Sequence, residues 1–147
     1  KGTKTRSAME ISSSIEAVGG EMNAFTSKEY TCFYARVIDT DLSLAVDVIA
    51  DLITSSIVTA TDVDSERSVV LEEIAMRDDD PSDLIHDLFM ETYYGNNVLG
   101  RPILGTIDSI KGMSRNAVFN YYKKKYYLHP YNNLQMNLLN HLVILLL

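Results

Sequence analysis

The sequence is poor in cysteine and in basic residues, and each shortage excludes a class of protein. Its single cysteine, Cys32, cannot form an intrachain disulfide, which favours the cytoplasm or another reducing compartment. The chain has 13 Lys and Arg residues and 20 Asp and Glu residues. The resulting net charge of −7 argues against a nucleic-acid partner and against an anionic membrane as partner. The apolar run that ends the chain is too short to span a bilayer.

The remaining features are those of a globular chain with several helices. Hydrophobic residues make up 46% of the 147 residues, which is enough to bury a core. Residues 7–10 have the Ser-x-x-Glu pattern of a capping box, and apolar residues follow at helical spacing until Gly19-Gly20. The same spacing predicts further helices over about residues 42–52, 61–77, 82–93 and 114–127.

Two runs of alternating residues predict a hairpin between the first two helices. The predicted strands are Glu21–Phe25 and Tyr30–Ile38, separated by a short polar turn. Helices combined with such a hairpin indicate an α+β fold, with helices packed on one face of a mainly antiparallel sheet. We expect one domain over residues 1–134, followed by a divergent Leu-rich tail over residues 135–147.

Two glutamates lie seven residues apart in the helix predicted from residue 61. At 100° per residue, Glu66 and Glu73 fall on one edge of the stripe that contains Val70 and Ile74. A carboxylate beside a buried stripe favours a partner, and a metal ion is one such partner. A solvated helix flank, with Glu73 paired to Arg77 at i+4, is the alternative that the helix alone leaves open.

Four separate motifs, in the same order, resemble one family of enzymes. They are Lys1-Gly2-Thr3, the Ala-Val-Gly-Gly-Glu-Met-Asn-Ala-Phe-Thr run at 17–26, the segment Glu66–Glu73, and Gly-Arg-Pro-Ile-Leu-Gly at 100–105. Together they resemble the inverzincin zinc metallopeptidases of the pitrilysin and mitochondrial processing peptidase type, especially bacterial processing-protease-like members. The resemblance extends from Lys1 to about Leu134, and it implies the fold of those metallohydrolases.

The resemblance assigns roles to residues of this chain. It implies a Zn²⁺ cofactor with Glu73 as one ligand, and Glu66 as a residue that supports catalysis from outside the coordination sphere. A helix rises about 10.5 Å over seven residues, too far for both carboxylates to bind one ion directly. The resemblance also implies that Asn23, Ala24 and Phe25 bind an extended peptide substrate at a sheet edge. The residues alone instead favour a simpler interpretation, in which Asn23 ends a strand or favours the turn.

The chain departs from that family most seriously at its start. The family binds zinc through an H-x-x-E-H motif placed just before Lys-Gly-Thr, and no such motif occurs here. The three histidines are His86, His129 and His141, and none forms that motif. We therefore expect a piece of a bacterial zinc metalloendopeptidase, truncated before Lys1, that lacks two His ligands and the base Glu and is inactive alone.

The resemblance also sets the expected partners. They are a peptide or unfolded protein as substrate, and a second peptidase half or partner subunit that closes over it. The alternative is a non-catalytic scaffold or regulatory homologue of the same family.

Overall fold

The computed structural model describes residues 1–126 and the backbone of a strand at residues 142–146. His129, His141 and most of the predicted Leu-rich tail lie outside these residues. The chain forms two compact units, the first made of Lys1–Ile57 and Asn120–Leu147 and the second of Val58–Phe119. None of the described helices is long and apolar enough to cross a membrane.

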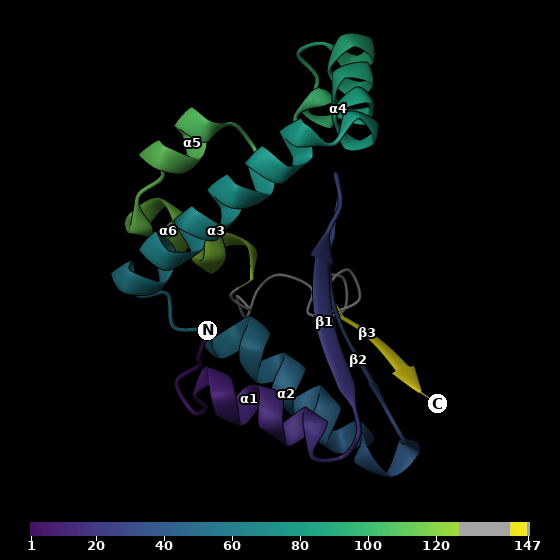
Figure 1. The fold of residues 1–147 in the computed structure, drawn as a ribbon. Helices are drawn as coiled ribbons and strands as arrows, with labels where there is room; N and C mark the ends of the chain where they lie inside the picture. Colours follow the sequence, from purple (N-terminus) through teal and green to yellow (C-terminus); the bar gives the residue numbers. More distant parts are fainter. Residues whose placement is uncertain (127–141, 147) are drawn as a thin grey trace. The chain divides into compact units, whose positions relative to one another are not determined.

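The first unit is built on a three-stranded sheet in the order β1-β2-β3 (Figure 1). β1 (Glu21–Thr26) and β2 (Thr31–Val37) form the predicted antiparallel hairpin, with Glu21 opposite Arg36 and Thr26 opposite Thr31. β3 (Leu142–Leu146) runs parallel to β2. The α+β class predicted from the sequence is confirmed.

Two helices cover one face of this sheet. They are α1 (Ala8–Glu16) and α2 (Leu42–Ser55), the latter preceded by a short 3₁₀ turn, η1 (Asp39–Asp41). One continuous core joins both helices to β2, and its buried members are Ile11, Ile15, Ala35, Val37, Ala45, Val48, Ile49 and Ile53. Ala35 and Val37 point to the same side of β2 because side chains alternate along a strand, so both helices pack on that side.

Local sequence signals set the ends of α1. Ser7 and Glu10 form the predicted capping box, in which each side chain bonds the backbone N–H of the other. Gly19 has φ +69°, a left-handed conformation that suits glycine, and it ends the helix as predicted. Gly20 lies so close to the core that a Cβ there would stand 2.8 Å from Val37 Cγ1.

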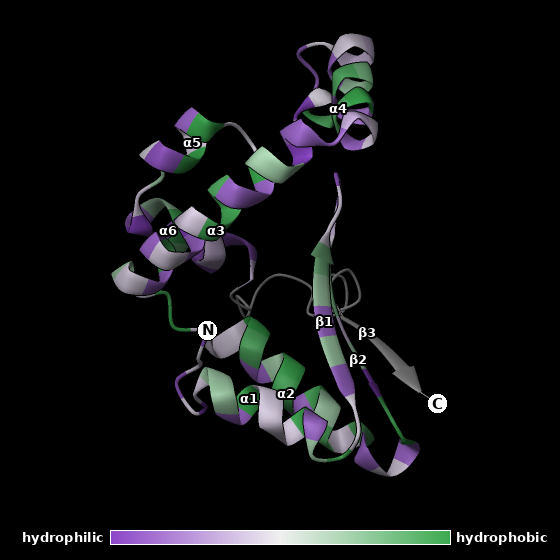
Figure 2. Ribbon diagram, in the orientation of Figure 1, coloured by the Kyte–Doolittle hydropathy of each residue, from purple (hydrophilic) through white to green (hydrophobic). Residues whose placement is uncertain are grey.

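The second unit contains the helix with the two glutamates. Its elements are α3 (Ala60–Asp79), α4 (Pro81–Tyr94), the 3₁₀ turn η2 (Val98–Gly100), α5 (Ile107–Gly112) and the start of α6 (Arg115–Lys125). Within residues 58–119, all of which the structure describes, Ile74 is the one buried apolar side chain. Figure 2 shows the contrast in hydropathy: α2 carries long hydrophobic stretches, whereas hydrophilic residues interrupt α3 along its length.

Polar contacts join the helices of the second unit. The Arg67 guanidinium on α3 donates to the backbone oxygens of Ile110 (2.5 Å) and Lys111 (3.2 Å), near the end of α5. A cation at a helix carboxyl end also interacts favourably with the helix dipole. Arg115 donates to the backbone oxygen of Val58 (2.7 Å), which ties α6 to the residue that starts the unit.

Candidate active site

α3 holds Glu66 and Glu73 on one continuous helix. Thr59 caps its amino end, where the Thr59 hydroxyl accepts a hydrogen bond from the backbone N–H of Asp62 (3.0 Å). Ile74 is 1% exposed and Val70 is half-buried, so the predicted apolar stripe is the buried side of the helix. Both glutamates are exposed to solvent.

The Glu73 carboxylate has no partner within the described part of the chain, where it forms neither an ion pair nor a hydrogen bond. The alternative predicted from the helix was an ion pair between Glu73 and Arg77. Arg77 instead contacts Asp78 (Nη2–Oδ1 2.7 Å) and Asp87 (Nη1–Oδ2 3.4 Å). The nearest cation in sequence is therefore engaged elsewhere, and the Glu73 oxygens remain available as ligands.

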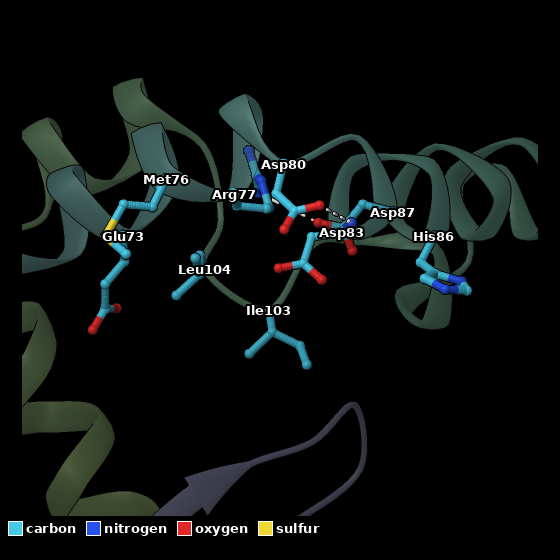
Figure 3. Close-up of a pocket in the computed structure, with 9 residues that line it drawn as sticks. All are labelled: Glu73, Met76, Arg77, Asp80, Asp83, His86, Asp87, Ile103 and Leu104. Atoms are coloured by element: carbon cyan, nitrogen blue, oxygen red, sulfur yellow. Dashed lines mark hydrogen bonds and ion pairs between the residues drawn. The ribbon is translucent and has the colours of Figure 1, made fainter.

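Glu73 lines an open cavity of about 510 Å³ formed by α3, the start of α4 and the loop after η2 (Figure 3). The cavity is rich in carboxylates, and its lining residues are Glu73, Met76, Arg77, Asp80, Asp83, His86, Asp87, Ile103 and Leu104. Four acidic groups face one Arg and one His, so the cavity is negative near neutral pH. In Figure 3 the carboxylates of Glu73 and Asp83 point to the same side of their helices, while His86 lies at the far end of the cavity from Glu73.

The acidic groups of this cavity differ in their roles. Asp80 is the N-cap of α4, and its Oδ1 accepts a hydrogen bond from the backbone N–H of Ser82 (2.8 Å). Asp87 contacts Arg77, whereas the Asp83 carboxylate has no partner among the residues that the structure describes.

The described residues do not contain a complete metal site. No three of their His, Cys, Asp and Glu side chains come together in a way that could hold a metal ion. Carboxylate oxygen is nevertheless a suitable zinc donor. The exposed Glu73 carboxylate could therefore serve as one such donor.

Glu66 lies two turns before Glu73 and borders a different, small cavity of about 140 Å³. That cavity is almost entirely apolar and is also lined by Val63, Arg67, Val70, Ile110, Met113 and Val118. The two glutamates thus lie on one helix but line separate cavities.

Asn23, Ala24 and Phe25 lie on β1, the edge strand in the sheet order, and all three are exposed. Asn23 Oδ1 accepts a hydrogen bond from the backbone N–H of Ala24 (2.8 Å), so a side chain already engages a main-chain donor of this strand. Phe25 packs edge-on against Tyr30, with ring centroids 5.9 Å apart. These three residues belong to the first unit, whereas Glu66 and Glu73 belong to the second.

Comparison with known proteins identifies the family. The profile of the insulinase family, peptidase family M16, matches residues 1–107. The chain belongs to the M16 peptidase family. Two relatives illustrate the match in sequence. An uncharacterized zinc protease of Streptomyces coelicolor is 58% identical over 126 residues, which cover 86% of this chain and 28% of that protein. The uncharacterized zinc protease YmxG of Bacillus subtilis is 46% identical over 131 residues, which cover 89% and 31%.

Two solved structures share the M16 fold with this chain. A protease from Helicobacter pylori matches with a TM-score of 0.75 at 22% identity, over 86% of this chain and 30% of that one. A peptidase M16 inactive domain from Pseudomonas fluorescens matches with a TM-score of 0.68 at 14% identity, over 82% and 30%. The chain spans about three tenths of the length of the curated relatives it matches.

Proposed function

We propose that this chain is part of a zinc-dependent metalloendopeptidase that hydrolyses peptides or precursor proteins. Membership in the M16 family supports this proposal, as do relatives that are named zinc proteases. The observation that carries it is the Glu73 carboxylate, which has no partner within the described residues and borders a large cavity. Because the relatives are about three times as long, the activity belongs to the full-length protein.

In this proposal Glu73 is one protein ligand of the zinc ion, and two His and a base Glu lie in an H-x-x-E-H segment just before Lys1. Zinc, when bound, supplies Lewis-acid activation of a water molecule. Glu66, about 10.5 Å along the helix from Glu73, acts from outside the coordination sphere. The chain alone, with one ligand of three, is inactive.

The substrate would add to β1 as a further strand. Asn23, Ala24 and Phe25 are exposed on the edge strand, and backbone pairing there grips an extended peptide with little regard to its sequence. The bond between Asn23 Oδ1 and the Ala24 N–H would then exchange for a bond to substrate if the peptide uses that donor. The rest of the full-length protein, or a partner subunit, would close over the bound peptide.

We place the enzyme in the bacterial cytoplasm, which agrees with its buried, free Cys32.

Peptide hydrolysis by the full-length protein tests the assignment of Glu73. We expect a chelator to abolish hydrolysis, and Glu73→Gln to lower kcat/KM by at least about a hundredfold because a neutral amide replaces the charged carboxylate ligand. Glu72→Gln is the matched control: Glu72 is also exposed, precedes Glu73 directly and does not line the cavity. Equal activity of the Glu73→Gln and Glu72→Gln proteins would contradict the proposal. A wild-type protein that neither binds zinc nor cleaves peptides would favour the scaffold or regulatory alternative.

The acid-lined cavity suggests a preference for substrates with a Lys or Arg side chain. Asp83→Asn removes a carboxylate without a described partner, so we expect kcat/KM for a cationic peptide to fall roughly two- to fivefold, as for one partly exposed charge pair. An uncharged peptide should be unaffected. Asp79→Asn is the control, since Asp79 carries the same charge close in sequence but does not line the cavity. A similar loss for both peptides, or for both variants, would remove the basis for this preference.

A further inference from the structure

The first six residues of the chain are fixed to the carboxyl end of α2 by backbone hydrogen bonds. The Lys4 N–H donates to the Ser55 oxygen (3.1 Å), and the Ile57 N–H donates to the Gly2 oxygen (3.1 Å). Thr3 and Ser56 form an isolated antiparallel bridge between these bonds. The segment therefore follows a defined path along the end of the helix.

A polar cluster completes this attachment, and we call Thr3, Thr5, Arg6 and Asp51 the Asp51 cluster. Asp51 Oδ2 accepts hydrogen bonds from Thr3 Oγ1 (2.6 Å), Thr5 Oγ1 (2.8 Å) and Arg6 Nη1 (3.0 Å). Thr3 Oγ1 in turn accepts from the backbone N–H of Arg6 (2.9 Å). Thr3 is 4% exposed and the Asp51 side chain 10%, so the Thr3–Asp51 bond is the best shielded from water, whereas Thr5 is exposed.

Residues 1–6 are Lys-Gly-Thr-Lys-Thr-Arg, so this segment itself contributes no apolar side chain. Hydrophobic burial begins only with Ile11 on α1. Hydrogen bonds to a charged acceptor such as the Asp51 carboxylate are stronger than hydrogen bonds between neutral groups. They also restrict the orientation of the three donors. The path of residues 3–6 therefore depends on the Asp51 carboxylate, together with the Arg6–Asp47 ion pair and the backbone bonds.

We propose that Asp51 is a positioning residue for the zinc site. By anchoring Thr3, Thr5 and Arg6, it fixes the direction in which the chain reaches Lys1, and so holds the segment before Lys1 in place. This inference rests on the proposed function, in which the two His ligands directly precede Lys1. Zinc binds its ligands at narrowly defined distances and in tetrahedral geometry, so a loosened anchor weakens zinc binding even in a folded protein.

The test compares zinc affinity in full-length variants, measured by chelator competition well below the melting temperature of each protein. We expect Asp51→Asn to weaken zinc binding about ten- to a hundredfold, as loss of a supporting hydrogen-bond partner does elsewhere. Asp47→Asn is the matched control. Asp47 lies one turn earlier on α2 and also pairs with Arg6, but its side chain is 64% exposed and does not contact Thr3 or Thr5. Its zinc affinity should stay within about twofold of wild type.

A second pair of variants covers the case in which Asp51→Asn does not fold. Thr3→Val removes the hydroxyl while keeping the shape, and Thr3→Ser keeps the hydroxyl. We expect Thr3→Val to weaken zinc binding and Thr3→Ser to restore it, which a loss of stability alone would not produce. Folded Asp51→Asn or Thr3→Val protein that binds zinc as tightly as wild type would overturn the positioning role.

The Glu73→Gln protein separates this claim from the proposed function. If Glu73→Gln loses zinc while Asp51→Asn keeps it, only the positioning role fails. If Glu73→Gln keeps zinc at wild-type affinity, the proposed function fails instead.

Discussion

At the scale of single residues, Asp51 shows how surroundings decide the state of a carboxylate. Burial by itself would raise the pKa of Asp51, but hydrogen bonds from Thr3, Thr5, Arg6 and Ser55 outweigh burial and hold the pKa below its usual value. Hydrogen bonds to Asp47 and Asp51 in turn raise the pKa of Arg6. Glu73 is the opposite case, an exposed carboxylate that no described residue engages.

The lowered pKa of Asp51 predicts that the attachment of the first six residues weakens in acid. A carboxyl group whose pKa is lower in the folded state stabilises that state above its unfolded pKa of about 3.9. This stabilisation is lost as the pH falls through the folded pKa. Amide hydrogen exchange at Lys4 and Ile57 measures the opening, and protection in wild type should fall more steeply below about pH 4 than in Asp51→Asn. Parallel pH profiles for the two proteins would show that Asp51 is not the titrating group.

At the scale of elements, two segments of the first unit meet the end of α2. The amino-terminal residues reach it through the Asp51 cluster, and α6 reaches it through Tyr122. The Tyr122 hydroxyl donates to the Ile53 oxygen (2.9 Å) and accepts from the Ser56 N–H (3.1 Å). One side chain thus satisfies two backbone groups where the helix ends.

Removing this hydroxyl should destabilise the first unit. In Tyr122→Phe two half-buried backbone groups lose their partner, which costs about 1–3 kcal/mol of unfolding free energy. Denaturant titration of wild type and variant measures the difference. The neighbouring Tyr121→Phe is the control, since Tyr121 is 60% exposed and its hydroxyl has no partner among the described residues. Equal losses in the two variants would mean that the Tyr122 bonds do not matter.

At the scale of the whole molecule, what could be read from the sequence was local. The capping box at Ser7 and the glycine stop at Gly19 depend on neighbouring residues, and both are confirmed. The hairpin strands and the helix spans agree within a few residues for the same reason. The stripe on α3 also followed from periodicity, with Ile74 buried as expected.

Features that join distant residues were not predictable from pattern. The Asp51 cluster links side chains about 45 positions apart, and nothing in the spacing of Asp51 distinguishes it from a solvated helix residue. The cavity beside Glu73 is formed by α3, α4 and the loop near Ile103. Asp83 can therefore be recognised as a residue of this cavity only once the packing of the helices is known. The division into two units, with one core rich in buried residues and one nearly without, likewise depends on tertiary packing.

The most direct measurement is a crystal structure of the full-length, zinc-loaded protein, with the metal located by its anomalous scattering. We predict a Glu73 carboxylate oxygen about 2.0–2.2 Å from the zinc ion, the ordinary length of a zinc–carboxylate bond, and Glu66 outside the coordination sphere. A zinc ion whose full set of protein ligands excludes Glu73 would contradict the account.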